Sequence, residues 1–563
     1  MADAIEMVTP SKPIALFIKQ DSHDQQPTQL AQPSADDGSR SRIRVTAILL
    51  ALSLSLFISA LDTTIVATAI PTISADLKAA SGYLWIGGAY ILASAAGAPL
   101  WAKLSDIWGR KLILLAAVAW FAGSSVLCAR ASSIEMLIIG RAFQGTAGGG
   151  LIQLVNIVVS DMFSMRQRSL YLGLCEFIWA LAGGIGPILG GVLTQLVSWR
   201  WIFWVNLPCS TLAFVLILLF LDVHNPKTRL MDGVKAIDWF GSISIIGLTV
   251  MLLLGLNFGG TTFPWDSPKV ICLIVFGCSM SVLFVFSEKN LARYPLIPLG
   301  LLKDRSCVMN LLVNSAHGFV FIAGEYYLPL YFQAVEEASP IRSGVLILPF
   351  ILSETVMGVM VGFLIHRTGR YLELMWIGTF LMTIGFGLFI HFNATSSLVE
   401  IVVSQIVAGI GSGLLFEPPL IAIQAHVAQD DTATATATFG FTMNMAMSIS
   451  IVVGGVIFQN SMQDSASMLS AAGLSADIVH KFAGDDAAAN VMVISTIVDA
   501  GQKDAIKGAY TSSLRNMWIL YTCVSFLGIV ASVFVQRREL SKEHVETRTG
   551  LIKKDDPISD PQI

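Results

Sequence analysis

Apolar segments of about 20 residues, the length of helix that spans a bilayer core, recur along most of the chain. Short polar stretches separate these segments, and we place fourteen of them. They lie near residues 45–67, 83–102, 112–129, 134–156, 169–194, 201–221, 239–257, 270–287, 308–334, 342–365, 373–392, 399–423, 435–458 and 513–536. The pattern predicts an all-α polytopic membrane protein with fourteen spans.

The composition agrees with this prediction. Apolar residues make up 54% of the chain and charged residues 13%, whereas soluble domains carry about 25% charged residues. The net charge of −4 is too small to indicate a nucleic-acid partner. The seven cysteines lie in or beside the spans without a CxxC pair, so no disulfide framework or metal site is indicated. We find no GxxxxGK[ST], HExxH or GxSxG motif, and we expect neither a cofactor nor enzyme activity.

Lys and Arg set the predicted orientation, because they are enriched in cytoplasmic loops. With the N-terminus inside, the short outside loops contain only Lys78, Arg130, Arg200, Lys269 and Arg342. The inside loops contain Lys103, Arg110, Lys111, Arg166, Arg168, Lys227, Arg229, Lys235, Lys289, Arg293, Lys303, Arg305, Arg367 and Arg370. We therefore expect residues 1–44, which are polar, to form a disordered cytoplasmic tail, and residues 537–563 to form a second cytoplasmic tail.

Two features then fall on the outside. Asn393-Ala-Thr is an N-glycosylation sequon in an outside loop, and we expect Asn393 to be glycosylated or at least externally accessible. The segment 459–512 becomes a long external loop, for which we expect a short helical excursion on the surface. Trp199, Trp201 and Trp204 lie at the outer end of the sixth span, where aromatic residues anchor helices at the membrane interface.

An internal repeat divides the spans into two halves. The pattern L-x-[DH]-x-x-G-R occurs at Leu104–Arg110 and again at Leu364–Arg370, in both cases after the second span of a half. Glycine-rich segments follow in the same order in both parts. We expect an N-terminal six-helix half at 45–221, a linker with two inserted spans at 222–307, and a C-terminal six-helix half at 308–536. Parallel six-helix repeats are a transporter architecture.

Five motifs carry a family resemblance: LDTTIVATAIP (61–71), KLSDIWGRK (103–111), GRAFQG (140–145), GGIGPILGG (183–191) and WRWIFWVNLP (199–208). Their order resembles the major facilitator superfamily, and more narrowly its fourteen-span drug:proton antiporters. The stretches GEYYLPLYFQAV and SPIRSGVLILP (324–349) resemble the fungal toxin-efflux members. The chain departs from the family at Ala102, where the first motif has Gly, and this methyl group is expected to loosen the contact between the halves.

Acidic residues inside the spans are candidates for proton coupling. Asp62 lies in the outer half of the first span, where a charge costs at least about 2.5 kcal/mol, so it faces a cavity or is protonated. Glu325 has the corresponding position in the ninth span, and Glu354 lies in the middle of the tenth. Glu176, Glu417 and His317 rank below them. Arg141 lies inside the fourth span and needs a carboxylate, carbonyl groups or water. The resemblance implies a role for Arg141 in proton transfer.

Two further motifs bear on conformational change. Asp106, Gly109, Arg110 and Lys111 lie in a tight inside turn, and we expect a latch between helices there. The resemblance implies that it holds the inner gate closed, and His366 replaces the acid in the second copy. The glycines Gly183, Gly184, Gly186, Gly190 and Gly191 predict a flat helix face. Pro187 bends that helix, so we expect an antiporter hinge at the seam between the halves.

Three functions remain open from the sequence. The first is proton-coupled efflux of small organic compounds, such as a toxin, secondary metabolite or drug, by alternating access. The second is plasma-membrane or vacuolar transport of a polar solute such as a basic amino acid, for which Asp62, Glu325 and Glu354 would supply carboxylates. The third is a non-transporting membrane sensor. We expect a monomer in the plasma membrane, with the vacuolar membrane as the alternative.

Overall fold

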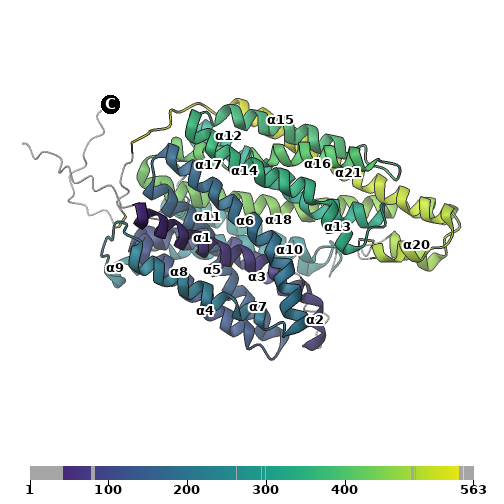
Figure 1. The fold of residues 1–563 in the computed structure, drawn as a ribbon, viewed down its shortest axis with the longest axis horizontal. Coiled ribbons are helices and arrows are strands. Elements are labelled where there is room, and N and C mark those ends of the chain that lie inside the picture. Colours follow the sequence, from purple (N-terminus) through teal and green to yellow (C-terminus); the bar gives the residue numbers. More distant parts are fainter. Residues whose placement is uncertain are drawn as a thin grey trace, which may run out of the picture. The chain divides into compact units, whose positions relative to one another are not determined.

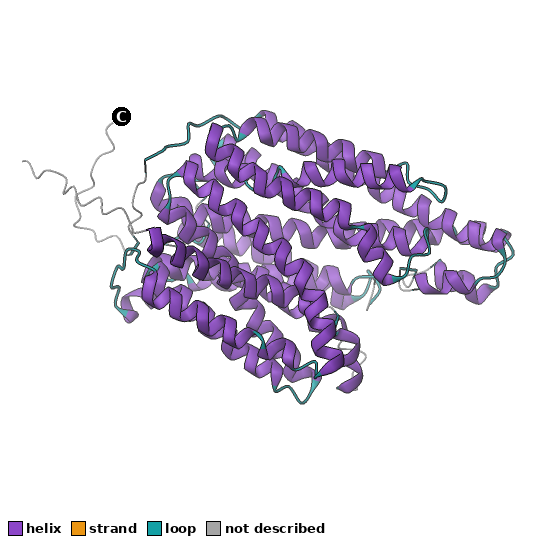
Figure 2. Cartoon of the chain, viewed as in Figure 1, coloured by secondary structure: helices purple, strands orange, loops and turns teal. Residues whose placement is uncertain are grey.

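The computed structural model describes residues 42–66, 68–77, 83–260, 263–292, 294–297, 299–483, 487–488, 490–543 and 549–550. Within these ranges the ordered structure is helical, and no strand exceeds a single bridge between Gly259 and Phe263 (Figure 2). Most of the predicted tail 1–44, together with Lys78 and Arg293, lies outside the described residues.

A helix or helix pair occupies each of the fourteen predicted spans. The first half contains α1 (Arg42–Ile65), α2 (Ile70–Asp76), α3 (Tyr83–Trp108), α4 (Arg110–Ala129), α5 (Ile134–Met162), α6 (Met165–Leu196), α7 (Trp201–Trp204) and α8 (Asn206–Phe220). The inserted part contains α9 (Leu230–Ala236), α10 (Trp239–Phe258) and α11 (Pro268–Asn290). The second half contains α12 (Arg305–Ala334), α13 (Pro340–Leu346), α14 (Leu348–Thr368), α15 (Leu372–Phe389), α16 (Leu398–Gly413), α17 (Pro418–Ala425), α18 (Thr432–Asp464) and α21 (Ala500–Val533). Thirteen of these described helical segments are long and apolar enough to cross a membrane, and α3, with 26 residues, occupies the remaining predicted position.

Some predicted boundaries were wrong. The first helix begins at Arg42, inside the segment expected to be a disordered tail. The external loop expected at 459–512 is shorter, because α18 continues to Asp464 and α21 begins at Ala500. Between them lie α19 (Ala466–Ala471), α20 (Ala476–Phe482) and a 3₁₀ turn, which agrees with the expected helical excursion. Hydropathy misses these extensions because polar residues continue a helix beyond the apolar segment.

Three predicted spans are divided into two helices. The breaks lie between α7 and α8, between α13 and α14, and between α16 and α17. Each break is followed within three residues by a proline, namely Pro208, Pro349 or Pro418. Proline lacks the backbone N–H that a helix interior needs, so the first turn of a helix, where this N–H has no partner, accommodates these three residues best.

The two halves repeat the same packing. In the first half α5 packs against α3 and α4, and in the second half α16 packs against α14 and α15. Figure 1 shows the purple-to-blue helices of the first half and the green-to-yellow helices of the second as separate groups. The groups are joined by α6, which contacts α14 and α17, and by α18, which contacts α3 and α5. The inserted helices α10 and α11 pack against each other, and α10 also contacts α3 and α18.

The repeated L-x-[DH]-x-x-G-R motif also repeats in its backbone. Gly109 has φ 91° and Gly369 has φ 70°, a region that residues with a side chain rarely adopt. A Cβ atom at Gly109 would lie 2.9 Å from Pro226 Cδ, and one at Gly369 would lie 2.7 Å from Arg166 Nη2. Glycine at each site therefore permits both the turn and the close packing.

The halves meet closely at the end that the charge pattern places inside. Arg168 Nη1 donates to Gln424 Oε1 at 3.0 Å, and His366 Nδ1 lies 3.0 Å from the carbonyl oxygen of Arg166. Ala102, expected to loosen this contact, is buried together with Ile157, Ala433 and Ala437, so its methyl group is accommodated between α3, α5 and α18. The structure therefore has the inner ends of the two halves in contact.

An ion-pair cluster at the opposite end gives a pH-dependent prediction. Glu337, after α12, pairs with Lys503 at 3.0 Å and Lys507 at 2.8 Å on α21. The two lysines, through hydrogen bonds and charge, hold the pKa of Glu337 below its ordinary value of 4.5. Because the pKa of Glu337 is lower in the folded protein than in the unfolded chain, the ion pairs stabilise the folded state at pH values above the unfolded pKa. This contribution is lost as the pH falls through the folded pKa.

We therefore expect Glu337→Gln to lower the free energy of unfolding by about 0.2–1 kcal/mol near neutral pH, the range for exposed pairs. The difference from wild type should shrink as the pH falls through and below 4.5. Thermal unfolding of the purified protein at a series of pH values measures this. Glu336→Gln is the matched control, and a difference that persists unchanged at low pH would contradict the account.

The topology gives a second prediction. Asn393 lies in the exposed loop between α15 and α16, with its Oδ1 accepting from Thr395 N at 2.8 Å and Thr395 Oγ1 at 2.7 Å. If this loop is external, a cysteine at position 393 should react with a membrane-impermeant thiol reagent in intact cells. Lys235→Cys, on the predicted inside, should react only after the cells are opened. The reverse pattern would invert the topology.

Candidate functional site

A buried ion pair lies inside the first half. Asp62 on α1 and Arg141 on α5 form a salt bridge between Asp62 Oδ2 and Arg141 Nη1, and each residue is at most 1% exposed. Asp62 was predicted to face a cavity or to be protonated. The structure instead pairs it with Arg141, and this also identifies the carboxylate that Arg141 was expected to need.

Polar side chains from α4, α5 and α8 complete the site. Gln144 Nε2 on α5 and Asn206 Nδ2 on α8 donate to Asp62 Oδ1 at 2.8 and 2.9 Å. Arg141 also donates to the carbonyl oxygen of Ile86 at 3.0 Å and to Gln144 Oε1 at 2.8 Å. Ser125 on α4 accepts from Gln144 Nε2 at 2.8 Å. Both carboxylate oxygens of Asp62 are therefore occupied by donors from the protein.

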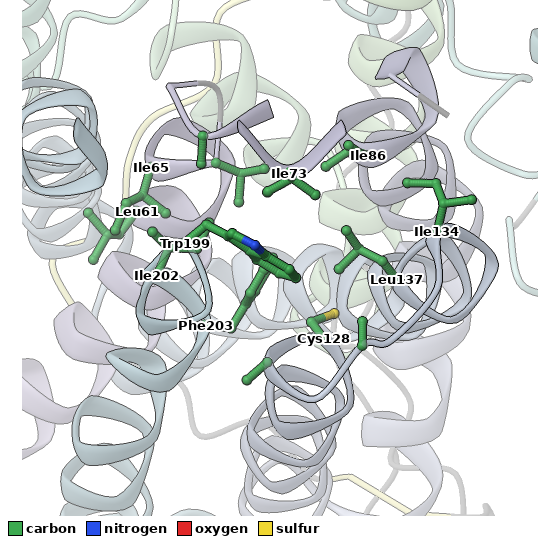
Figure 3. Packing of buried hydrophobic residues seen from close by; sticks show 14 of the residues in the cluster. Leu61, Ile65, Ile73, Ile86, Cys128, Ile134, Leu137, Trp199, Ile202 and Phe203 are labelled. Carbon is green, nitrogen blue, oxygen red and sulfur yellow. The ribbon is translucent and has the colours of Figure 1, made fainter. Parts of the chain in front are cut away.

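Apolar side chains surround this network. Figure 3 shows a buried apolar cluster that contains Leu61, the neighbour of Asp62 in the sequence, together with Ile65, Trp199 and Phe203. The Arg141 guanidinium lies 4.4 Å from the centre of the Tyr90 ring and 5.9 Å from that of Phe203. Trp199, expected to be an interface anchor, is buried in this cluster and donates to Asp76 at 2.9 Å. Charges in such surroundings interact strongly, because little water screens them.

Sequence reasoning missed Gln144, Asn206, Ser125 and Tyr90 as members of the site. Gln144 and Asn206 do lie in two of the family-like motifs, GRAFQG and WRWIFWVNLP. That location was the available signal. Ser125 and Tyr90 had no comparable signal, because only the packing of α3 and α4 brings them to the ion pair.

The glycine-rich helix α6 is joined to the same site through Thr64. Thr64 Oγ1 donates to the carbonyl oxygen of Ala182 at 3.0 Å. A Cβ atom at Gly186 would lie 2.0 Å from Thr64 Oγ1, and one at Gly190 would lie 2.3 Å from the carbonyl oxygen of Ile65. These two glycines therefore let α6 approach α1, which belongs to the same half.

The other predicted hinge glycines are different. Gly183, Gly184 and Gly191 have no neighbouring atom within 4 Å of a built Cβ position. The flat face thus contains only two of the five expected glycines, Gly186 and Gly190. It packs against α1 within the first half and not at the contact between the halves. Contact with the second half is made by the earlier part of α6, around Ser169 and Gly173. Pro187 lies inside the continuous helix α6.

The predicted latch is centred on Arg110, which is 1% exposed. Its Nη1 donates to Asp106 Oδ1 at 2.5 Å and its Nε to Asp161 Oδ2 at 2.7 Å. The latch thus ties α3, α4 and α5 together, and Asp161 is a member that the sequence did not reveal. Lys111 is partly exposed at the start of α4 and makes no hydrogen bond or ion pair among the described residues. In the second copy, Arg370 is exposed.

The remaining acidic candidates lie in a separate cluster. The charge of Glu354 on α14 interacts with Glu325 on α12 and with Glu176 on α6, and Glu176 also interacts with Glu417. Glu354 is 7% exposed and its Oε2 has no hydrogen-bond partner. The structure therefore brings Glu325 and Glu354 together but does not place them at the Asp62–Arg141 pair. The described residues contain no cluster of His, Cys, Asp and Glu suited to a metal ion.

Two helical halves, a buried ion pair within one of them and many apolar helices define a multi-pass membrane transporter. The sequence profile of the Major Facilitator Superfamily matches residues 52–455. The chain is 45% identical over 519 residues to the efflux pump dotC of Dothistroma septosporum, covering 92% of this chain and 89% of that protein. It is 42% identical over 521 residues to the MFS-type transporter ppz2 of Metarhizium majus, covering 92% and 90%.

Solved structures show the same fold. The human organic anion transporter MFSD10 aligns with a TM-score of 0.55 at 14% identity, covering 87% of this chain and 99% of that one. The proton:xylose symporter XylE aligns with the same TM-score and identity, covering 90% and 97%. The chain belongs to the Major Facilitator Superfamily.

The different surroundings of the glycines give a matched test. Gly186→Val inserts a branched side chain against Thr64, so we expect it to lower the free energy of unfolding by about 1–3 kcal/mol, as overpacking does. We also expect transport to fall while equilibrium ligand binding survives. Gly184→Val meets no neighbour and should resemble wild type in stability and transport. Equal effects of the two substitutions, or an equal loss of binding and transport in Gly186→Val, would contradict this reading.

Proposed function

We propose that this transporter exports small, mostly apolar organic compounds, such as a toxin, secondary metabolite or drug, in exchange for protons. The observation that carries the proposal is the buried Asp62–Arg141 pair with its Gln144 and Asn206 donors. Efflux is supported by the relatives, since dotC and the Gibberella fujikuroi protein FUS6, 34% identical over 541 residues, are both named efflux pumps.

The other contacts of Arg141 support proton exchange at this pair. Breaking a buried ion pair is costly when the remaining charge has no other partner. Arg141 has other partners: the carbonyl oxygen of Ile86, the amide oxygen of Gln144 and the face of Tyr90. When Asp62 takes up a proton, Arg141 can therefore keep hydrogen bonds while its attraction to α1 weakens.

Proton uptake at Asp62 would be felt by α6. Thr64, two residues after Asp62, bonds to Ala182 and contacts Gly186. A shift of this part of α1 relative to α5 therefore moves the surface on which α6 rests. We propose that α6 rocks in this way, and that the Asp106–Arg110–Asp161 latch keeps α3, α4 and α5 as one rigid unit meanwhile.

Transport of a basic solute is less well supported. Of the three carboxylates expected to bind the cation, Asp62 is not free, because both of its oxygens accept hydrogen bonds and its side chain is fully buried. Among the residues that the structure describes, no feature favours a sensor function without transport. We propose the plasma membrane as the location and a monomer as the working unit.

The proton gradient supplies enough energy for this function. One proton moving inward across 100 mV and one pH unit releases about 2.3 plus 1.4 kcal/mol. At about 1.4 kcal/mol per tenfold change, this supports roughly 500-fold accumulation of a neutral compound. One coupling carboxylate is therefore sufficient for detoxification.

Asp62→Asn tests the proposal. We expect it to abolish export driven by a pH gradient in proteoliposomes, measured with a panel of apolar and basic compounds. Because Asn leaves the Arg141 charge without its carboxylate, the folded fraction must be measured in the same preparation, and Asp62→Glu, which keeps the charge, should retain part of the activity. Asp266→Asn, in the exposed loop before α11, should behave as wild type. Wild-type export by folded Asp62→Asn would show that Asp62 is structural.

A further inference from the structure

The span formed by α16 and α17 is interrupted at a carboxylate. Residues Leu414–Glu417 lie between the end of α16 at Gly413 and the start of α17 at Pro418. Backbone without helical hydrogen bonds at membrane depth occurs only where protein or a polar cavity surrounds it. In transporters, such discontinuous helices often form binding sites for coupling ions. This break in the helix is therefore a candidate for a second site that binds the coupling ion.

Glu417 is the last residue of the break. It is 2% exposed, and neither carboxylate oxygen has a hydrogen-bond partner. A residue at this position usually accepts from the N–H groups of the next helical turn. Here the first two residues of α17 are Pro418 and Pro419, and the Glu417 side chain makes no capping bond. Pro419 thus removes one of the two usual donors, and the Glu417 side chain accepts no hydrogen bond from the other.

The side chain of Glu417 lies in the contact between the two halves. A Cβ atom at Gly173 on α6 would lie 2.9 Å from Glu417 Oε1. A Cβ atom at Gly362 on α14 would lie 3.1 Å from each of its carboxylate oxygens. Gly173 and Gly362 also approach each other, since the Cβ position of Gly173 is 3.4 Å from Gly362 Cα. The carboxyl group is therefore enclosed as long as α6 and α14 remain together.

The titratable groups around Glu417 do not neutralise a negative charge. Glu176 interacts with it directly, and Cys175 interacts with both glutamates. The His317 ring packs 4.8 Å from the Phe416 ring. The other charged groups on the helices around Glu417 are Arg166 and Arg168 on α6, Arg305 and Glu325 on α12, Glu354, His366 and Arg367 on α14, Glu373 on α15, Glu400 on α16 and Asp464 on α18. Of these, Arg168 is bonded to Gln424 and Gln429, and Glu373 to Arg537.

We propose that Glu417 is a proton-binding site of the inner gate, which holds a proton while α6 and α14 are in contact and releases it when they separate. The proposal rests on the proposed function, because it takes the coupling ion to be a proton and this end of the protein to be cytoplasmic. An ionised carboxylate without a partner is strongly disfavoured in such an enclosed position, whereas the neutral acid is tolerated. Separation of the helices lets water reach the group, so that the O–H bond breaks and the proton passes to cytoplasmic water.

This site does a different task from the Asp62–Arg141 pair. Asp62 has a cationic partner and lies within one half, so its charge state changes contacts inside that half. Glu417 lies between the halves, so its charge state decides whether they can meet. Glu176, on the facing helix, strengthens the effect because two negative charges would repel across the contact.

Distance measurement between spin labels tests the proposal. Gln167 on α6 and Thr368 on α14 are exposed residues at the inner ends of the facing helices. Cysteines at these positions, in a chain whose seven native cysteines are replaced, carry the labels in liposomes. In the wild-type background we expect a short distance at acidic pH and a population with a longer distance at alkaline pH. Glu417→Gln should keep the short distance at both pH values, and Glu417→Met, of similar length but apolar, should do the same.

Two further variants make the result specific. Glu400→Gln, at the exposed start of α16, should respond to pH as wild type does. Asp62→Asn should also keep the pH response, even though it loses transport. A pH response in Glu417→Gln equal to that of wild type, or no pH response in wild type, would overturn the proposal. Failure of the proposed function would appear elsewhere, as export by the wild-type protein that does not depend on a pH gradient.

Discussion

A charge pair enclosed within a membrane protein must find all its partners in the protein itself. Asp62 and Arg141 satisfy this constraint with donors and acceptors from several helices: Ile86 on α3, Gln144 on α5 and Asn206 on α8. The arrangement fixes where these helices can lie relative to α1. The first half is thus organised around one ion pair, and any change in its charge must change the way the helices are held.

The glycine contacts convert this local arrangement into a possible movement. Gly186 and Gly190 bring α6 against α1 beside the ion pair, and Gly173 brings the other part of α6 against α14 of the second half. One helix therefore contacts both the proposed coupling site and the contact between the halves. Arg110 makes the opposite contribution, because its two ion pairs hold α3, α4 and α5 together.

Much of the fold followed from the sequence because a membrane imposes simple rules on it. Span length and hydropathy located all fourteen helical positions, and the repeated L-x-[DH]-x-x-G-R motif located two halves. The ends of α18 and α21 could not be located in this way, because beyond the apolar core hydropathy carries no information about helix ends. The break before Pro418 does not appear in a hydropathy pattern, although the consecutive prolines Pro418 and Pro419 are a sequence signal for it.

The site was only partly predictable. Asp62 and Arg141 stood out as charges inside apolar spans, but their pairing across 79 positions depends on how α1 and α5 pack. The same applies to the glycines. Only the packing shows that Gly186 lies against Thr64, whereas Gly184 faces open space. Lys111 follows Arg110 in the motif, yet it is partly exposed and takes no part in the ion pairs of Arg110.

The central claim is that Asp62 takes up and releases a proton while Arg141 turns to its other partners. Infrared spectroscopy of the protein in liposomes measures this directly, through the C=O stretch that a carboxyl group gains on protonation. The account predicts that the change recorded between alkaline and acidic pH contains a carboxyl band that is missing in Asp62→Asn, together with a guanidinium shift that is missing in Arg141→Lys. Identical spectra for wild type and Asp62→Asn would show that Asp62 stays ionised and would contradict the account.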